Sequence, residues 1–526
     1  MRRLILLASV LALPATATAD STTVWDGRVR MGGILKDENG DRTTTQETFN
    51  IHEGYSLSSL YLNGRFNPLT HLRLDLTDIN LDDRRGTFDF RKTGILAARA
   101  RYDESRYLFD PAGAVSASRK DLWSTVSVTP SRWIWFSGDY GLQKREGDRI
   151  GFPEGVQSIL GSAYDSQLHR YRAEVQARSN NGVGGTVSYE QVRLNDDLDP
   201  RNERDGHVYA AIVRVPGLVY DRLTHVVRGS IGRSELPEME LGYDVATIQY
   251  TGVIAPWRSI RGKYRFYGSR VEDESTDNRT DRYVHDGDIE ARYRDALLSV
   301  GYGWEAWDDD RSVTTYDNLR ASLGVGRSGD AVSGRFSWST RNKDDEEDVT
   351  LLRDTEYARW DGRVDGRLPF GLLAGARVAD RTRKMSDIGA EASGFTTSAY
   401  GAYDYEHFGD AGVISGRLRV DYIYADDDFD NRIGAYHVIS HTVVSRLDAD
   451  FHEKISAAVA VTYLSLGEDI DIDKSLLSFE LGYRFPKGFS ADARYNVYNY
   501  DDYLVTDRFY TANVVWFNVG YAFSTE

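Results

Sequence analysis

The stretch VISGRLRVDYIY, residues 413–424, separates into two sets when every second residue is read. One set is apolar or aromatic, apart from Gly416, and consists of Ile414, Leu418, Val420, Tyr422 and Tyr424. The polar set consists of Ser415, Arg417, Arg419 and Asp421. Because alternate side chains of a β-strand point to opposite faces, this pattern predicts a strand with one apolar and one charged face. The apolar face would meet a core in a soluble protein and lipid in a transmembrane barrel.

The N-terminal residues predict export from the cytoplasm. Arg2 and Arg3 precede an apolar run at 4–13, and small residues follow at 17–19. This is the pattern of a secretory signal peptide cleaved after Ala19, so we expect 1–19 to be removed and 20–526 to form a single barrel domain. The chain has no cysteine, which excludes disulfides, thiolate metal sites and covalently attached haem.

The chain is acidic. Its formal net charge of −17 becomes −19 when Arg2 and Arg3 leave with the signal peptide, which argues against nucleic acid as a partner. Beyond the N-terminal run the sequence has no apolar stretch long enough for a transmembrane helix.

The alternating pattern recurs from end to end and predicts about 26 strands, within a range of roughly 22 to 28. Each strand with its connection takes about 20 residues, close to a ~10-residue membrane strand plus a turn or loop. Tight turns rich in Gly, Pro and Asn alternate with longer acidic stretches at 195–200, 308–310, 344–348, 426–430 and 468–473. We therefore predict an all-β fold, a transmembrane antiparallel β-barrel in the bacterial outer membrane, with tight turns in the periplasm and acidic loops outside.

Strand alternation also predicts which charged residues face the lumen. These candidates are Arg170, Arg172, Glu174, Arg261, Lys263, Arg265, Arg292, Arg294, Arg417, Arg419, Asp421 and Arg494. They would either select ions or dock a partner, or they would pair with inward-facing acidic residues and make the solvated wall more rigid.

The final strand, 509–523, alternates and ends in aromatic residues, as expected for a terminal signal read by the barrel-insertion machinery. The signal residues are Phe517, Val519, Tyr521 and Phe523. Tryptophans near strand ends predict girdles at the lipid interfaces: Trp133, Trp135, Trp304, Trp307, Trp360 and Trp516. Outer-membrane lipid and lipopolysaccharide are the expected surroundings.

A barrel of this strand number would have a diameter of roughly 50 Å and a lumen of roughly 30 Å. We expect no plug domain, because only residues 20–23 precede the first strand candidate. The longest gap between strand candidates, 145–164, could constrict such a lumen but not seal it. A separate protein inside the barrel is therefore the expected filler.

The segment LRLDLTDINLDDRRGTFDFRKTGILAARARYDESRYLFDP, residues 72–111, resembles the early hairpins of the MtrB/PioB porins. The resemblance implies a large plugless barrel that sheathes a periplasmic multihaem cytochrome, as part of an electron conduit across the outer membrane. It implies haem in the partner and no cofactor bound by this chain itself.

The main alternative is a diffusion porin, either general or cation-preferring, because the predicted lumen is polar and the rims are acidic. An enzyme is not expected, since none of the ten histidines lies in a recognisable catalytic or metal-binding motif. The acidic stretches could bridge divalent cations or remain solvated, and 37–41 reads as a plain turn.

Overall fold

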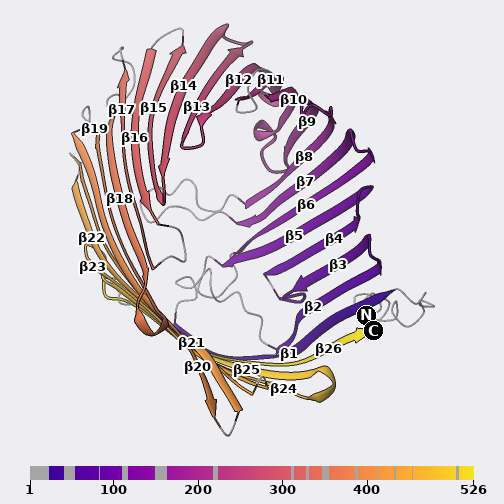
Figure 1. The fold of residues 1–526 in the computed structure, drawn as a ribbon, viewed down its shortest axis with the longest axis vertical. Helices are drawn as coiled ribbons and strands as arrows, with labels where there is room; N and C mark the ends of the chain where they lie inside the picture. The colour runs from indigo at the N-terminus through magenta and orange to yellow at the C-terminus, as the bar shows by residue number, and fades with distance from the viewer. Residues whose placement is uncertain are drawn as a thin grey trace.

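One continuous β-sheet accounts for the fold. The computed structural model describes residues 23–40, 54–81, 83–108, 116–148, 163–216, 223–309, 313–326, 331–345, 355–385, 389–409, 412–431, 434–452, 454–504 and 509–525. These form a 26-stranded sheet that is closed by pairing between β1 (Val24–Gly40) and β26 (Phe509–Thr525) (Figure 1). The predicted all-β class and strand number are confirmed.

The remaining strands follow one another around the barrel. They are β2 (Gly54–Asn67), β3 (Thr70–Thr77), β4 (Arg84–Lys92), β5 (Leu96–Leu108), β6 (Ser116–Ser131), β7 (Ile134–Asp148), β8 (Ala163–Arg178), β9 (Gly184–Asp196), β10 (Arg204–Pro216), β11 (Leu223–Leu236), β12 (Leu241–Trp257), β13 (Ile260–Asp273), β14 (Asn278–Tyr293), β15 (Ala296–Asp309), β16 (Val313–Val325), β17 (Val332–Asp345), β18 (Thr355–Arg367), β19 (Leu372–Met385), β20 (Ala390–Gly409), β21 (Gly412–Asn431), β22 (Gly434–Phe451), β23 (Ile455–Glu468), β24 (Ile472–Arg484) and β25 (Phe489–Asp502).

Every ladder is antiparallel, and each strand pairs with its neighbours in sequence. The closing ladder runs in unbroken register from Trp25 opposite Thr525 to Gly40 opposite Tyr510. Closure satisfies the backbone groups that an open sheet would leave at its edges, which is the condition for crossing a bilayer with strands.

The connections differ at the two ends of the barrel. At the end that holds the first residue of β1 and the last of β26, most turns are tight, as between β2 and β3. All four short 3-10 turns of the described residues connect consecutive strands, and each begins with proline: η2 (Pro200–Asn202), η3 (Pro237–Met239), η4 (Pro369–Gly371) and η6 (Pro486–Gly488). None of the helices in the described ranges is long and apolar enough to cross a membrane.

The prediction that the acidic stretches are loops was partly wrong. Residues 426–430 lie inside β21, 308–309 end β15 and 344–345 end β17. The physical reason is that these strands are longer than the ~10 residues a membrane crossing needs, so pairing continues beyond the lipid belt. Residues 346–348, which complete the stretch 344–348, lie outside the described residues. So do residues 1–19 of the predicted signal peptide and residue 41, the last of the predicted turn 37–41.

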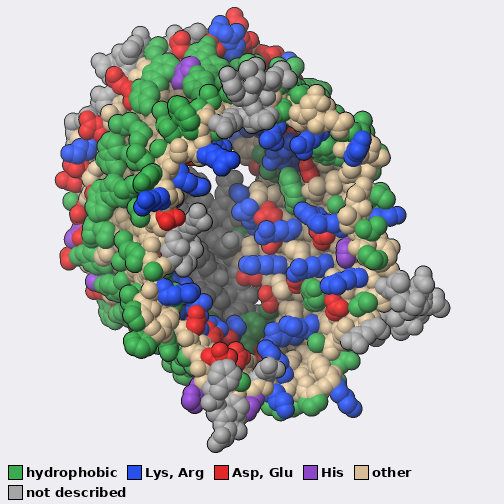
Figure 2. Space-filling model, viewed as in Figure 1, with side chains coloured by type: hydrophobic (Ala, Val, Ile, Leu, Met, Phe, Trp, Pro, Cys, Tyr) green, Lys and Arg blue, Asp and Glu red, His purple; other side chains and the backbone are tan. Residues whose placement is uncertain are grey.

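Apolar side chains cover much of the outer surface, and charged side chains crowd the inner wall (Figure 2). On the outer face of β23, for example, Val459, Val461 and Tyr463 keep 37%, 38% and 38% of their surface exposed. Only a small buried cluster exists among the described residues, on the lumen side of the seam, and it includes Ile34, Tyr510 and Val514. The barrel is therefore apolar outside and polar inside, the reverse of a soluble protein.

Candidate functional site

The lumen wall is the candidate functional site. Residues that face each other across a ladder share one face of the sheet, so the register extends the charged face from strand to strand. Across β20, β21 and β22, for example, Asp404, Arg417 and Asp448 lie in one row. The view down the barrel in Figure 2 shows that the charged face lines the lumen.

All but one of the predicted lumen candidates lie within strands on this face. The exception is Arg294: β14 ends at Tyr293, and Arg294 occupies the turn to β15 with a φ of 51°. Its guanidinium lies 5.4 Å from the centre of the Tyr293 ring. The alternation was extended one residue too far, because a tight turn reverses the chain there.

Many of the predicted candidates form ion pairs along the wall. Their N···O distances are 2.7 Å for Arg170–Glu190, 2.6 Å for Arg172–Glu174, 3.5 Å for Arg417–Asp404, 2.7 Å for Arg419–Asp421 and 3.1 Å for Arg494–Glu480. Most of these arginine side chains are more than one-third exposed, so each pair contributes little stability on its own. Together, these ion pairs make the lumen wall solvated, ordered and charged.

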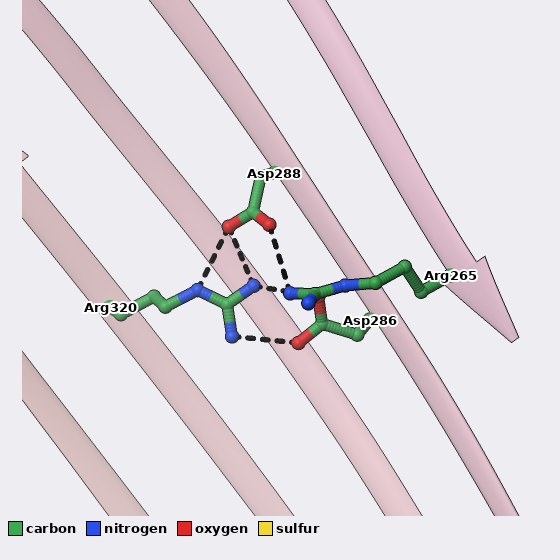
Figure 3. A network of polar contacts seen from close by, with 4 residues as sticks. All are labelled: Arg265, Asp286, Asp288 and Arg320. Carbon is green, nitrogen blue, oxygen red and sulfur yellow. Dashed lines mark hydrogen bonds and ion pairs between the residues drawn. The ribbon is translucent and has the colours of Figure 1, made fainter. Parts of the chain in front are cut away.

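The most connected ion-pair network spans four strands (Figure 3). Arg265 on β13 donates to Asp286 on β14 at 2.6 Å, and lies 3.4 Å from Asp288. From the other side, Arg320 on β16 donates to Asp286 at 2.7 Å and to Asp288 at 2.6 Å. Two carboxylates are thus held between two guanidiniums.

Arg320 can reach β14 because the intervening strand presents glycine there. Gly301 and Gly303 lie on the lumen face of β15, opposite Asp288 and Asp286. A Cβ on Gly301 would overlap Asp288 and lie 2.6 Å from Nε of Arg320. The two glycines therefore open a path across β15. Alternation within 313–325 could have placed Arg320 on the lumen face, but nothing in the sequence indicates its partners.

A second feature absent from the predictions is a basic surface on three neighbouring strands. The lumen-facing residues of β17, β18 and β19 include Arg335, Arg341, Lys343, Arg359, Arg363, Arg367, Arg377, Arg381 and Arg383. Among the described side chains on this face of these strands, only Asp361 and Asp365 are acidic. We call this set the arginine patch. It is strongly basic although the whole chain has a net charge of −17.

The terminal signal residues lie on the outer face at the seam. Phe517, Val519 and Tyr521 keep 52%, 46% and 39% of their surface exposed. The Phe523 ring lies against Gly27 of β1, where a Cβ would overlap it. Their position on the outer surface of the closing strand suits recognition and lipid contact, and the insertion role stays a prediction.

Three of the predicted girdle tryptophans face the lumen instead, and one of them is Trp135, which the register pairs with Gln176 on the lumen face of β8. The register pairs Trp516 with Arg494 and Trp307 with Arg282, whose guanidinium lies 4.8 Å from the Trp307 ring centre. A position near a strand end does not decide which face of the sheet a side chain occupies, because a shift of one residue moves the side chain to the opposite face.

One group of side chains could hold a cation, near the end of the barrel opposite the first residue of β1 and the last of β26. Asp426, Asp428 and His437 each offer a ligand atom within 4.8 Å of the others, and His437 Nε2 lies 3.0 Å from Asp426. They point outward from β21 and β22. Exposed groups of this kind are common without a metal, so the cluster remains compatible with a simple hydrogen bond.

A closed antiparallel barrel with an apolar exterior and a charged lumen defines the class: a large β-barrel of the outer-membrane type. No protein-family model matches the chain, and no curated protein matches its sequence.

Solved structures resemble the fold. The siderophore receptor PirA from Acinetobacter baumannii aligns with a TM-score of 0.52 and 8% identity, over 95% of this chain and 80% of that one. PirA from Pseudomonas aeruginosa gives 0.46 and 10%, with the same coverage. The alcaligin outer-membrane receptor FauA from Bordetella pertussis gives 0.43 and 12%, over 95% and 76%. At such identities the similarity shows the fold alone, and these comparisons do not support the resemblance to MtrB/PioB.

Proposed function

We propose that this barrel encloses a periplasmic protein and holds it across the outer membrane. The single observation that carries the proposal is the width of the closed barrel wall. Apart from Thr23, which precedes β1, all described residues belong to the 26 strands or to connections between neighbouring strands. A barrel of that strand number is roughly 50 Å across, with a lumen of roughly 30 Å. A hole of that width would leak solutes unless something occupies it.

The proposed occupant is a multihaem cytochrome, which would make the assembly an electron conduit. The segment that resembles the MtrB/PioB porins, 72–111, supports this partner; it includes β4, β5 and most of β3. The exposed, charged lumen side chains support docking of a folded protein surface, since charged walls favour oriented association. The proposal assigns this chain no catalytic residue and no cofactor, because the haem would belong to the partner.

Purification from the native envelope tests the proposal. The chain carrying an affinity tag would be extracted in mild detergent, and the complex would be stained for haem and analysed by mass spectrometry. We expect a haem-containing periplasmic protein in about equal amount. A bare barrel that contains no haem protein, recovered at low salt where charge contacts persist, would contradict the proposal. Sequencing the N-terminus of the same sample would test cleavage after Ala19.

A diffusion porin is the second candidate, and the polar lumen wall favours it. The arginine patch supports a preference for anions rather than the cations that the acidic rims suggested. Planar-bilayer recording distinguishes the two candidates. A porin gives large steady conductance when isolated from its native membrane, whereas a barrel with its partner in place gives little.

A further inference from the structure

Three arginines of the arginine patch stand side by side at the same height of the wall. Arg335 on β17 lies directly opposite Arg363 on β18, and Arg363 lies directly opposite Arg377 on β19. Like charges directly opposite one another destabilise a sheet. An arrangement that violates a local rule in this way is expected at a functional site.

Carboxylates compensate these charges only in part. Arg363 donates to Asp365 from Nε at 2.6 Å and from Nη2 at 3.0 Å. Asp361 is shared: Nε of Arg377 lies 2.7 Å from it, and Arg359 lies 3.8 Å away. Within the described ranges, no carboxylate forms an ion pair with Arg335. The carboxylates therefore orient the guanidiniums but leave positive charge in excess.

The arginines surround a cavity that opens to the lumen. It has a volume of about 600 Å³, and its lining includes Arg335, Arg359, Arg363, Arg377 and Asp361. Four serines, at 299, 322, 337 and 339, also line it. The side chains of Arg359, Arg363 and Arg377 are 48%, 56% and 48% exposed, so unused N–H donors are accessible.

We propose that this cavity is a binding site for a polyvalent oxyanion, a small solute that carries several phosphate or carboxylate groups. Guanidinium forks bind both groups through paired N–H donors, and serine hydroxyls add further donors. Adjacent strands lie about 4.8 Å apart, so the outer two arginines of the row are separated by about 10 Å at the backbone. A ligand with two or more anionic groups could therefore contact more than one guanidinium.

The inference goes beyond the proposed function and does not depend on it. Both a porin and a sheath could carry such a site, and its failure would leave the partner experiment unaffected. Binding can be measured on the full chain, folded in detergent, without any partner.

Equilibrium dialysis at 0.1 M KCl tests the site with two probes, inorganic pyrophosphate and citrate. The test variant is Arg335→Gln, Arg363→Gln and Arg377→Gln together. The control variant is Arg170→Gln, Arg172→Gln and Arg494→Gln, which removes the same lumen charge elsewhere. We expect saturable binding of at least one probe to the wild type. The test variant should bind at least about tenfold more weakly, and the control within about twofold.

Folding of each variant would be checked by its heat-dependent gel mobility. Should the triple variant not fold, Arg335→Gln alone replaces it, because no described carboxylate depends on Arg335. Preference for pyrophosphate or for citrate would identify the anionic group. Two results would overturn the proposal. One is no saturable binding of either probe. The other is an equal loss of binding in the test and control variants, which would show that the probes respond only to the overall charge of the lumen.

Discussion

Arg320 on β16 donates to Asp288 on β14 at 2.8 Å from Nε and 2.6 Å from Nη2, although β15 lies between them. The contact exists because Gly301 places no side chain in its path. Arg265 completes the network from the opposite side. Side chains of β13, β14 and β16 are thus tied together inside the lumen across β15, in addition to the backbone ladders.

Gly301→Ala should therefore weaken the barrel. The new Cβ would overlap Asp288 and crowd Arg320, so the bridge across β15 must open. Losing charge-assisted hydrogen bonds costs about 1.5–3 kcal/mol. The measurement is the temperature at which the folded gel band is lost. Gly287→Ala is the control, because a Cβ there would have no neighbour within 4 Å. Equal melting of the two variants would contradict the role given to the network.

Arg320→Ala and Arg419→Ala should differ although both remove a lumen arginine. Arg320 is 28% exposed and forms ion pairs with two carboxylates on β14, two strands away. Arg419 is 49% exposed and pairs with Asp421 on its own strand. We expect Arg320→Ala to destabilise by about 2–4 kcal/mol and Arg419→Ala by less than about 1 kcal/mol. Urea unfolding in lipid vesicles would measure both, and a larger effect at Arg419 would refute the ranking.

Gly32→Ala should impair closure of the seam. A Cβ on Gly32 would overlap the backbone carbonyl oxygen of Phe517 on β26, and a backbone atom cannot move aside as a side chain can. The neighbouring Gly33→Ala is the matched control, since its Cβ would lie 3.7 Å from the nearest atom, the carbonyl oxygen of Gly54. We expect a smaller folded fraction for Gly32→Ala in refolding gels and normal folding for Gly33→Ala. Full folding of both variants would show that the seam tolerates widening.

Asp78, in the connection between β3 and β4, should make stability depend on pH. Burial raises the pKa of this carboxyl, opposed by the charge of Arg85 and assisted by that of Asp83. The folded state therefore holds the proton more tightly than the unfolded chain. Stability is fullest below the ordinary value of 3.8 and falls as pH rises through the folded-state pKa.

Asp78→Asn removes this charge and suits the φ of 53° at this position, because asparagine tolerates the left-handed region. We expect the variant to melt higher than the wild type at pH 7, and the gain to vanish toward pH 3. Asp277→Asn is the control, at an exposed position with a φ of 57°. A gain of the same size at both positions, or one that does not depend on pH, would exclude burial of Asp78 as the cause.

The sequence alone determined the β class, the approximate strand number and the face of most wall residues. In β21, Arg417, Arg419 and Asp421 face the lumen as their spacing predicts, because a period of two is a local property of one strand. The same rule failed at Arg294, where a turn interrupts the period. The girdle prediction for Trp516 depended on a place near a strand end, but Trp516 lies in the middle of β26 and faces the lumen, as the period of two requires.

Only the tertiary structure decided which residues of different strands meet. The pairing of Arg335 with Arg363 and of Arg363 with Arg377 depends on the register of two ladders among three strands, which no single strand specifies. Net charge is a sum over the whole chain, whereas the lumen presents one face of each strand. An acidic protein can therefore have a strongly basic patch on its inner wall.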